Sequence, residues 1–168
     1  MRRPLLLAAL LAVVGLALGG GIWAARGGAQ EATPVAAPGG GEATLIVVER
    51  NDNVTDVDLG ALGPSAGDLR VWGPNALYDE ANTTDTGATT QGTCVALDTA
   101  ADCLLDETVV FPDGSTIEIQ GIQLGGGVPS MRTIVGGSGR YLGAAGTVDV
   151  APTADETVWS KTFAIVRR

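Results

Sequence analysis

The feature that most limits the fold of this chain is the spacing of its apolar residues after about residue 43. No segment there repeats apolar residues three and four positions apart, as an amphipathic helix requires. Short runs rich in β-branched residues alternate instead with clusters of turn-forming residues. We therefore expect an all-β domain, with strands over residues 44–50, 68–77, 89–97, 103–111, 115–124, 129–135, 142–150 and 158–166.

Two arrangements suit eight short antiparallel strands. A closed barrel pairs every strand on both sides and leaves no exposed sheet edge, whereas a two-sheet sandwich keeps its edges. We expect an eight-stranded antiparallel closed barrel over residues 43–168, with the sandwich as the alternative from the pattern alone. In the run TIEIQGIQL, Ile117 and Ile119 share a face but Ile122 is out of phase with them, so we predict a β-bulge at Gly121.

The N-terminal stretch is a candidate signal or anchor. Arg2 and Arg3 precede an uncharged run over residues 4–25, which is longer than a usual signal-peptide core and close to the ~20 residues that span a bilayer. Within residues 1–29 we expect either a signal peptide or a membrane anchor, and both place the remainder outside the cytoplasm, secreted or anchored. The small, Gly- and Pro-rich residues 30–42 predict a flexible linker.

The charge excludes some classes of partner. Three of the ten basic residues lie in residues 1–29, whereas all nineteen acidic residues follow, so seven basic residues face nineteen acidic ones and the formal charge is −12. Such a surface repels nucleic acid, so we expect no nucleic-acid partner and membrane contact only through the N-terminal segment. The chain has no histidine, the commonest general base and metal ligand. We expect neither a metal nor a cofactor.

A few side chains are candidates for chemistry or binding. Cys94 and Cys103 flank a short turn, which predicts a disulfide in an exported chain; a free, reactive Cys94 is the alternative. Without histidine, an acid–base step would need a carboxylate or a tyrosine, and Cys94, Asp79 and Tyr78 are the weak catalytic candidates. The acidic run NDNVTDVDLG, residues 51–60, departs from the EF-hand spacing, so we expect a solvated loop there rather than a calcium site.

The stretch IVGGSGRYLGAAGTVDV, residues 134–150, has glycines that invite comparison with a phosphate-binding loop. No helix pattern follows them, however, and a dinucleotide fingerprint needs one. We predict that Gly136, Gly137 and Gly139 form a tight turn through positive φ angles. Gly143 and Gly146 would let the returning strand curve or approach a neighbour closely.

The same stretch resembles the signature strand–turn–strand of the dirigent and allene oxide cyclase barrel families. GDLRVWGPNALYDEAN, GATTQGTCVALD and FPDGSTIEIQG are similar to further strands and turns of these families, in the correct order. The resemblance implies an eight-stranded barrel that holds a small apolar molecule, such as a lipid or phenolic compound, in a homo-oligomeric (trimeric) assembly. The residues expected to line its ligand cavity are Trp72, Tyr78, Ile117, Ile119 and Tyr141.

Most of the acting residues of these families are replaced here. The resemblance places the first-strand glutamate and asparagine of the plant cyclases at Ile46 and Val48, and retains only their cysteine, as Cys94. Other acting positions of the two families fall on Pro74, Asn75, Gln123, Arg140 and Ala145. We therefore expect an exported small-molecule-binding barrel that steers cyclisation or coupling of an apolar substrate, isomerase-like if it is catalytic. The alternative is a non-catalytic envelope or cell-surface module.

Overall fold

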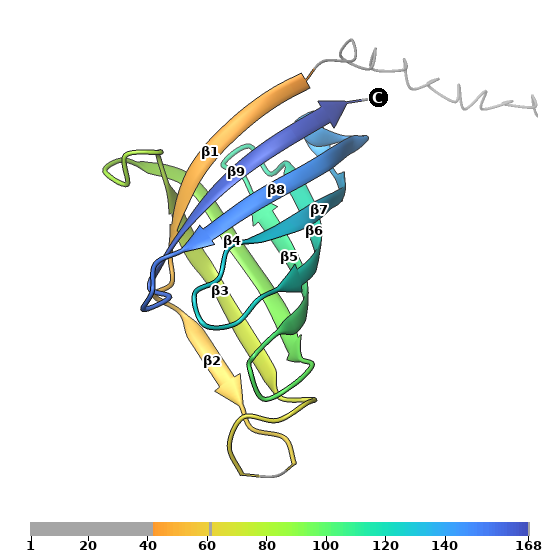
Figure 1. Cartoon of the computed structure of the whole chain (residues 1–168). Coiled ribbons are helices and arrows are strands. Elements are labelled where there is room, and N and C mark those ends of the chain that lie inside the picture. The colour runs from red at the N-terminus through yellow and green to blue at the C-terminus, as the bar shows by residue number, and fades with distance from the viewer. Residues whose placement is uncertain (1–41, 61, 168) are drawn as a thin grey trace, which may run out of the picture. The chain divides into compact units, whose positions relative to one another are not determined.

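The computed structural model describes residues 42–60 and 62–167, and in them the chain forms nine β-strands and one short 3-10 helix (Figure 1). The expected signal or anchor segment and the linker up to residue 41 lie outside the described residues. The elements are β1 (Glu42–Arg50), β2 (Val54–Val57), β3 (Leu69–Tyr78), β4 (Asp85–Ala96), β5 (Cys103–Val110), β6 (Thr116–Gln123), β7 (Ser130–Gly137), η1 (Gly139–Tyr141), β8 (Ala144–Pro152) and β9 (Val158–Arg167).

The strands form one sheet that closes on itself. From β3 to β9 each strand pairs antiparallel with the next, and β9 pairs with β1 along its whole length. The other side of β1 pairs with β3, where Val48 faces Tyr78 and Glu49 faces Leu77. Because both sides of β1 are paired, β1 and β3–β9 make a closed antiparallel barrel. The expected barrel is confirmed and the sandwich is excluded.

Strand β2 is the element that the sequence pattern missed. It lies inside the acidic run, for which we expected a loop, and its four residues pair with Leu69–Trp72 of β3. β2 therefore continues the line of β1 beyond a break at residues 51–53. Its VTDV sequence is short and carries a charge, so it resembles a loop until its partner strand is known.

The barrel has two ends, or mouths. At the upper mouth of Figure 1 lie the β3–β4 and β5–β6 loops, η1, and the first residues of β1. At the lower mouth lie β2, the β2–β3 loop and the β4–β5, β6–β7 and β8–β9 turns. Along each strand, inward-facing side chains alternate with outward-facing ones. The inward-facing residues near one end of the strands line the upper mouth, and those near the other end line the lower mouth.

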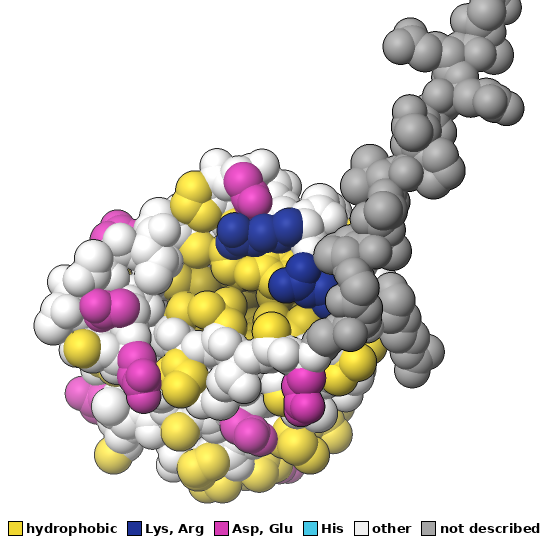
Figure 2. Space-filling view, turned by 90° about the horizontal axis from the view of Figure 1, so that it is seen from above, with side chains coloured by type: hydrophobic (Ala, Val, Ile, Leu, Met, Phe, Trp, Pro, Cys, Tyr) yellow, Lys and Arg dark blue, Asp and Glu magenta, His cyan; other side chains and the backbone are white. Residues whose placement is uncertain are grey.

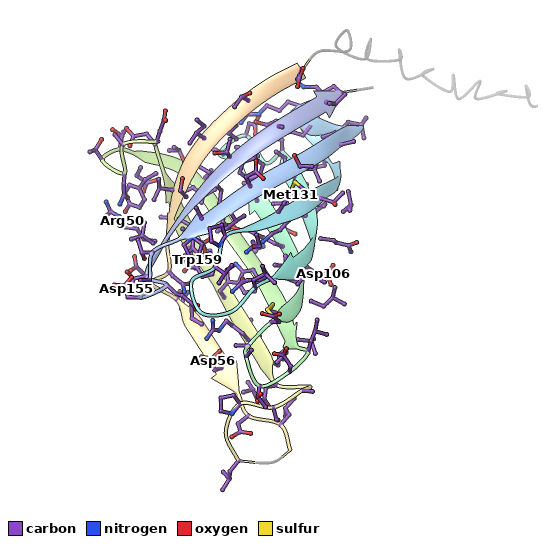
Figure 3. All side chains as sticks on the ribbon, viewed as in Figure 1. Arg50, Asp56, Asp106, Met131, Asp155 and Trp159 are labelled. Carbon is purple, nitrogen blue, oxygen red and sulfur yellow. A yellow bond between two sulfur atoms is a disulfide. The ribbon has the colours of Figure 1, made fainter. Side chains whose placement is uncertain are left out.

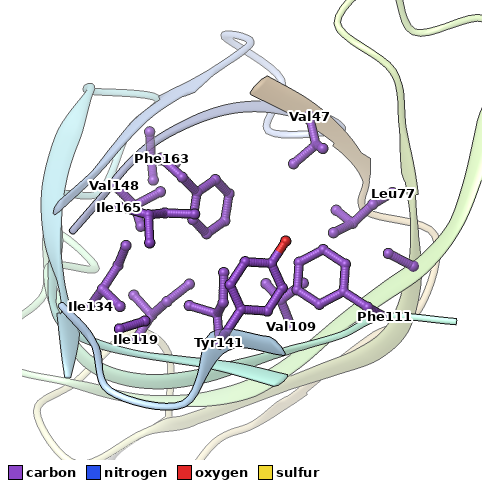
Figure 4. Packing of buried hydrophobic residues seen from close by; sticks show 14 of the residues in the cluster. Val47, Leu77, Val109, Phe111, Ile119, Ile134, Tyr141, Val148, Phe163 and Ile165 are labelled. Carbon is purple, nitrogen blue, oxygen red and sulfur yellow. The ribbon is translucent and has the colours of Figure 1, made fainter. Parts of the chain in front are cut away.

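An apolar cluster fills much of the interior (Figure 4). Burying each of its larger side chains contributes about 1.5–3 kcal/mol. Its members are Val47, Leu77, Ala88, Val109, Phe111, Ile117, Ile119, Ile134, Tyr141, Ala144, Val148, Val150, Trp159, Phe163 and Ile165.

The predicted bulge at Gly121 is wrong. β6 pairs with β5 without interruption, and Gly121 lies opposite Leu105 in that register. Ile117 and Ile119 are buried, and so is Gln123, while Ile122 is half-exposed on the outer face. Inward-facing and outward-facing side chains therefore alternate along the whole strand. The sequence pattern did not show this because the inward residue at position 123 is a glutamine and not an apolar residue.

The glycine-rich stretch contains two kinds of glycine. Gly139 in η1 has a φ of +56° and makes the turn, but the prediction is wrong for Gly136 and Gly137, which belong to β7 and do not have positive φ angles. Gly146 in β8 has a φ of +139°, and a Cβ there would lie 1.9 Å from the carbonyl oxygen of Ala164 on β9. The close approach expected at Gly146 is therefore present.

Gly146→Ala is expected to lower the free energy of unfolding by about 3 kcal/mol, because the new methyl group meets backbone and the φ angle is strained. Gly136→Ala is the control, since nothing lies within 4 Å of a Cβ there, and it should change stability by less than about 0.5 kcal/mol. Urea unfolding of both variants tests this. Equal effects of the two substitutions would contradict the close contact.

Candidate functional site

The interior between the apolar cluster and the lower mouth contains a group of charged side chains, which we call the buried charge cluster: Glu49, Glu107, Arg132 and Lys161. Each is less than 5% exposed. Nζ of Lys161 lies 2.5 Å from Oε2 of Glu49 and also contacts Oε1 of Glu107. Arg132 donates from Nη1 to Oε2 of Glu107 at 2.5 Å. Two carboxylates and two cations leave the cluster formally neutral, and they join β1, β5, β7 and β9 across the barrel.

Neutral side chains complete the cluster. Thr90 donates from Oγ1 to Glu107 at 2.6 Å, and Asn75 donates from Nδ2 to Glu49 at 2.8 Å. Gln123 accepts a hydrogen bond from Nη2 of Arg132 at 3.1 Å. Nε of Arg132 is buried and has no hydrogen-bond partner among the described residues. One donor of the cluster is therefore left for another acceptor.

The protonation of Glu107 follows from these contacts. Burial by itself raises the pKa of this carboxyl group, because the charged form loses its hydration. The adjacent ammonium of Lys161 and guanidinium of Arg132, together with hydrogen bonds from Lys161 and Thr90, outweigh burial and lower the pKa. Glu107 is therefore a carboxylate at neutral pH and anchors the cluster.

A pocket of about 300 Å³ opens at the lower mouth. Its walls are mainly apolar, and its rim carries carboxylates. The lining residues are Asp56, Val57, Asp58, Gly63, Pro64, Ser65, Asp68, Leu69, Arg70, Cys94, Ala96, Asp98, Ala101 and Cys103. We call this the lower-mouth pocket.

Arg70 separates the lower-mouth pocket from the buried charge cluster. It lines that pocket and also a smaller cavity of about 20 Å³, whose other walls include Trp72, Trp159, Glu49, Arg132 and Lys161. In Figure 3 Trp159, which lines the small cavity, lies above Asp56, which lines the lower-mouth pocket. A molecule that enters the lower mouth therefore meets an apolar wall and then the Arg70 guanidinium, and the two indole rings and the buried charges lie behind that guanidinium.

Two carboxylates hold Arg70 in this position. Its Nε and Nη2 donate to the two oxygens of Asp56 on β2 at 2.7 and 3.2 Å, and its Nη1 lies 3.5 Å from Oε2 of Glu156 in the β8–β9 turn. The hydrogen bond to Asp56 is the largest cause of a raised pKa of Arg70. β2 is thus tied to the barrel wall by the same side chain that forms the inner wall of the pocket.

The structure brings together three of the five residues expected to line one cavity. Ile117, Ile119 and Tyr141 belong to the packed apolar cluster, and Tyr141 also lines a pocket at the upper mouth. Trp72 lies outside that cluster and lines the small cavity. Tyr78 is half-buried, and the guanidinium of Arg50 lies over its ring, 3.7 Å from the ring centroid.

Of the three catalytic candidates, Tyr78 and Asp79 are consecutive in the chain, whereas Cys94 lines the lower-mouth pocket. Cys94 and Cys103 form a disulfide, and both line the lower-mouth pocket. Asp79 lies in the β3–β4 loop, where hydrogen bonds from the backbone of Thr83 and Thr84 lower its pKa to about 2. Asp79 thus stabilises a loop, and Tyr78 lies against Arg50.

The acidic run has partners of its own. Asp56 binds Arg70, and Asp58 accepts a hydrogen bond from the backbone of Gly63. Among residues 42–60 and 62–167, no group of three or more Asp, Glu or Cys side chains is arranged to hold a metal ion. Within the same ranges, no helix has the length and apolar character needed to cross a membrane.

The buried charge cluster was not predicted, although its residues are in phase with apolar neighbours. Lys161 alternates in step with Trp159 and Phe163, and Glu107 with Leu105 and Val109. A charged residue in an inward phase on several strands is the signal that could have revealed the cluster.

Strand β1 contributes one buried carboxylate, Glu49. Asn75 donates from Nδ2 to Glu49 at 2.8 Å and to Oδ1 of Asn51 at 3.2 Å, so both residues of the β1 end contact β3.

Comparisons with known proteins find similarity only among solved structures. No protein-family model and no curated protein sequence matches the chain. A pyocyanin demethylase superposes with a TM-score of 0.64 at 19% identity, covering 73% of this chain and 99% of that one. The pterocarpan synthase dirigent protein GePTS1 gives 0.64 at 15% identity, covering 77% and 86%. The Diels–Alderase AbmU from Streptomyces koyangensis gives 0.61 at 21% identity, covering 76% and 69%.

These identities establish a likeness of fold. One neighbour is a dirigent protein and another is a Diels–Alderase, and each shares the barrel over most of the described residues. The fold of this chain is therefore similar to the barrels of these proteins, as the resemblance of its sequence implied.

Proposed function

We propose that this chain binds a small, largely apolar molecule in the lower-mouth pocket and holds it in a conformation that favours ring closure or coupling. The proposal rests on the order of side chains from the opening of the pocket inward. Apolar walls end at the Arg70 guanidinium, and Trp72 and Trp159 lie behind it. Apolar walls with a few converging polar groups are typical of small-molecule sites.

The chemistry available there suits a reaction directed by shape. Holding one conformer near the geometry of bond formation removes part of the entropic barrier to ring closure. Arg70 offers hydrogen bonds to an oxygen that gains negative charge, and the apolar walls of the pocket offer contact surface for an unsaturated chain or ring. The activities named for two structural neighbours, a pterocarpan synthase and a Diels–Alderase, support ring formation as the class of reaction. The disulfide supports an oxidising, extracytoplasmic location.

A second candidate is a non-catalytic envelope or cell-surface module. It is favoured by the apolar cluster, which fills much of the barrel with the chain's own side chains, and by the small size of the innermost cavity, about 20 Å³. The two functions differ in whether the lower-mouth pocket binds a ligand.

Ala96→Phe separates them. Ala96 lines the lower-mouth pocket, whereas Val95 beside it on β4 is 43% exposed on the outer face, so Val95→Phe is the matched control. Native mass spectrometry of the purified chain with a panel of lipids and phenolic compounds should detect a bound compound. We expect Ala96→Phe to weaken its binding about tenfold or more, since the new ring fills the pocket, and Val95→Phe to leave it unchanged. Absence of binding across the panel, or equal effects of the two variants, would favour the structural module.

A further inference from the structure

We infer a second binding site, at the upper mouth, for an amphipathic carboxylate whose apolar chain enters the barrel and whose charged end binds Arg140 and Arg167. The site is separate from the lower-mouth pocket and does not depend on the function proposed for it. Its pocket has a volume of about 320 Å³ and is lined by Leu45, Val47, Thr86, Ala88, Phe111, Pro112, Asp113, Arg140 and Tyr141.

The apolar part of the site is open to the outside. Figure 2 looks onto the upper mouth and shows a hollow lined by hydrophobic side chains, with basic side chains beside it. Phe111 and Tyr141 stack with their ring centroids 4.6 Å apart and form one wall. In Figure 4 the hydroxyl group of Tyr141 points away from the wall that carries it, toward Val47 and Leu77. A chain entering the hollow therefore meets apolar side chains and the hydroxyl group of Tyr141.

The charged part consists of two guanidinium groups over these aromatic faces. Cζ of Arg140 lies 4.7 Å from the ring centroid of Phe111 and 5.0 Å from that of Tyr141. Cζ of Arg167 lies 5.8 Å from the centroid of Tyr141, and its Nη1 donates to the carbonyl oxygen of Arg140 at 3.5 Å. Stacking on aromatic rings keeps the planar donor groups at the edge of the hollow, where they can bind a carboxylate.

The distribution of charge makes this mouth unusual on an acidic protein. The other basic residues that the structure describes lie elsewhere: Arg132 and Lys161 inside the barrel, Arg70 at the lower mouth beside Asp56, and Arg50 beside Asn82 and Tyr78. Arg140 and Arg167 remain, and both lie at the upper mouth. Asp113 is the carboxylate of this pocket, and it holds Arg140 only at 3.5 Å, with both side chains about half exposed. Donors of both guanidinium groups therefore stay free for an anionic ligand.

The ligand class follows from the combination of surfaces. An apolar hollow of this volume accepts an alkyl or aryl chain of modest length, and two guanidinium groups at its edge favour a terminal carboxylate over a neutral group. A fatty acid or an aryl-substituted acid has both parts. A neutral molecule with the same chain would gain the apolar contacts alone.

Binding of decanoate and of 1-decanol to the full chain tests this site. We expect decanoate to bind about tenfold more tightly than decanol in titration calorimetry, because charge-assisted hydrogen bonds are gained by the acid alone. The double variant Arg140→Gln/Arg167→Gln should lose that preference, with decanol binding unchanged. Arg50→Gln is the matched control, since Arg50 also covers a tyrosine ring but lies away from the hollow, and it should keep the preference.

Amide chemical shifts locate the ligand. Decanoate should move the signals of Ala88, Phe111 and Tyr141, and Ala96→Phe at the lower mouth should leave its affinity unchanged. Equal affinity for acid and alcohol, shifts confined to the lower-mouth pocket, or an unchanged preference in the double variant would overturn the inference. Loss of binding at the lower mouth alone would overturn the proposed function and leave this site standing.

Discussion

Glu107→Gln is expected to lower the free energy of unfolding by about 3–5 kcal/mol, the usual cost of removing one partner from a buried ion pair. The glutamate accepts from Lys161, Arg132 and Thr90 in the interior, so the substitution leaves two buried cations with a single buried carboxylate, Glu49. A domain of this size is stabilised by about 5–15 kcal/mol in total, so the variant should unfold at much lower urea concentration.

Two further variants test the cause. Glu118→Gln makes the same chemical change on β6, where Glu118 is half-buried and accepts a hydrogen bond from Thr108, and should cost about 1 kcal/mol or less. Adding Lys161→Met to Glu107→Gln restores a neutral interior, so the double variant should be more stable than Glu107→Gln alone. A Glu107→Gln effect no larger than that of Glu118→Gln would show that the buried charge cluster contributes little to stability.

The same contacts predict the response to acid. The pKa of Glu107 is lowered in the fold to about 2 from an ordinary value of 4.5. A carboxyl group whose pKa is lowered by folding stabilises the fold fully at pH values above its pKa in the unfolded chain. This stabilisation is lost as the pH falls from 4.5 towards 2. Urea unfolding at several pH values should therefore show the difference between wild type and Glu107→Gln shrinking across this window.

Replacing both cysteines by alanine is expected to lower stability by about 2–3 kcal/mol. Cys94 and Cys103 are nine positions apart and join β4 to β5 diagonally, since Cys94 pairs with Leu105 and Cys103 with Ala96. Closing such a short loop removes conformational freedom from the unfolded chain. Both cysteines also line the lower-mouth pocket, so the double variant should bind its ligand more weakly.

Thiol labelling provides the direct check. The chain has two cysteines in all, so the unfolded but unreduced protein should show no free thiol, and reductant should destabilise the wild type but not the alanine variant. Two labelled cysteines without reductant would contradict the disulfide and restore Cys94 as a candidate reactive group.

Local patterns were enough to find the barrel strands. Runs such as CLLDETVV and VWSKTFAIV alternate inward and outward residues with turn residues at their ends, and the structure has a strand at each of the eight predicted positions. β2 was missed because four residues with an exposed carboxylate carry too little pattern. The bulge assigned to Gly121 failed for a related reason: a buried Gln123 does not look like an interior residue until its partner Arg132 is known.

The candidate sites could not be predicted in this way. Lys161, Glu107 and Glu49 are distant in the chain, and each is tolerated in the interior only because the others neutralise it there. The same holds for Arg70, which forms the inner wall of the lower-mouth pocket because Asp56 and Glu156 converge on it from different elements. The expected cavity residues were chosen by type, and type does not tell which mouth a residue faces.

The sequence by itself determined the all-β class, the order of the barrel strands, and the glycine positions that the turn at Gly139 and the close approach at Gly146 require. These follow from period-two alternation and from the conformations open to glycine, which are local properties. Only the tertiary structure decided that the sheet closes through β1 and β3, that four charges meet in the interior, and that each mouth has its own pocket. Those features arise when residues far apart in sequence are brought within a few ångströms, where burial and charge act between them.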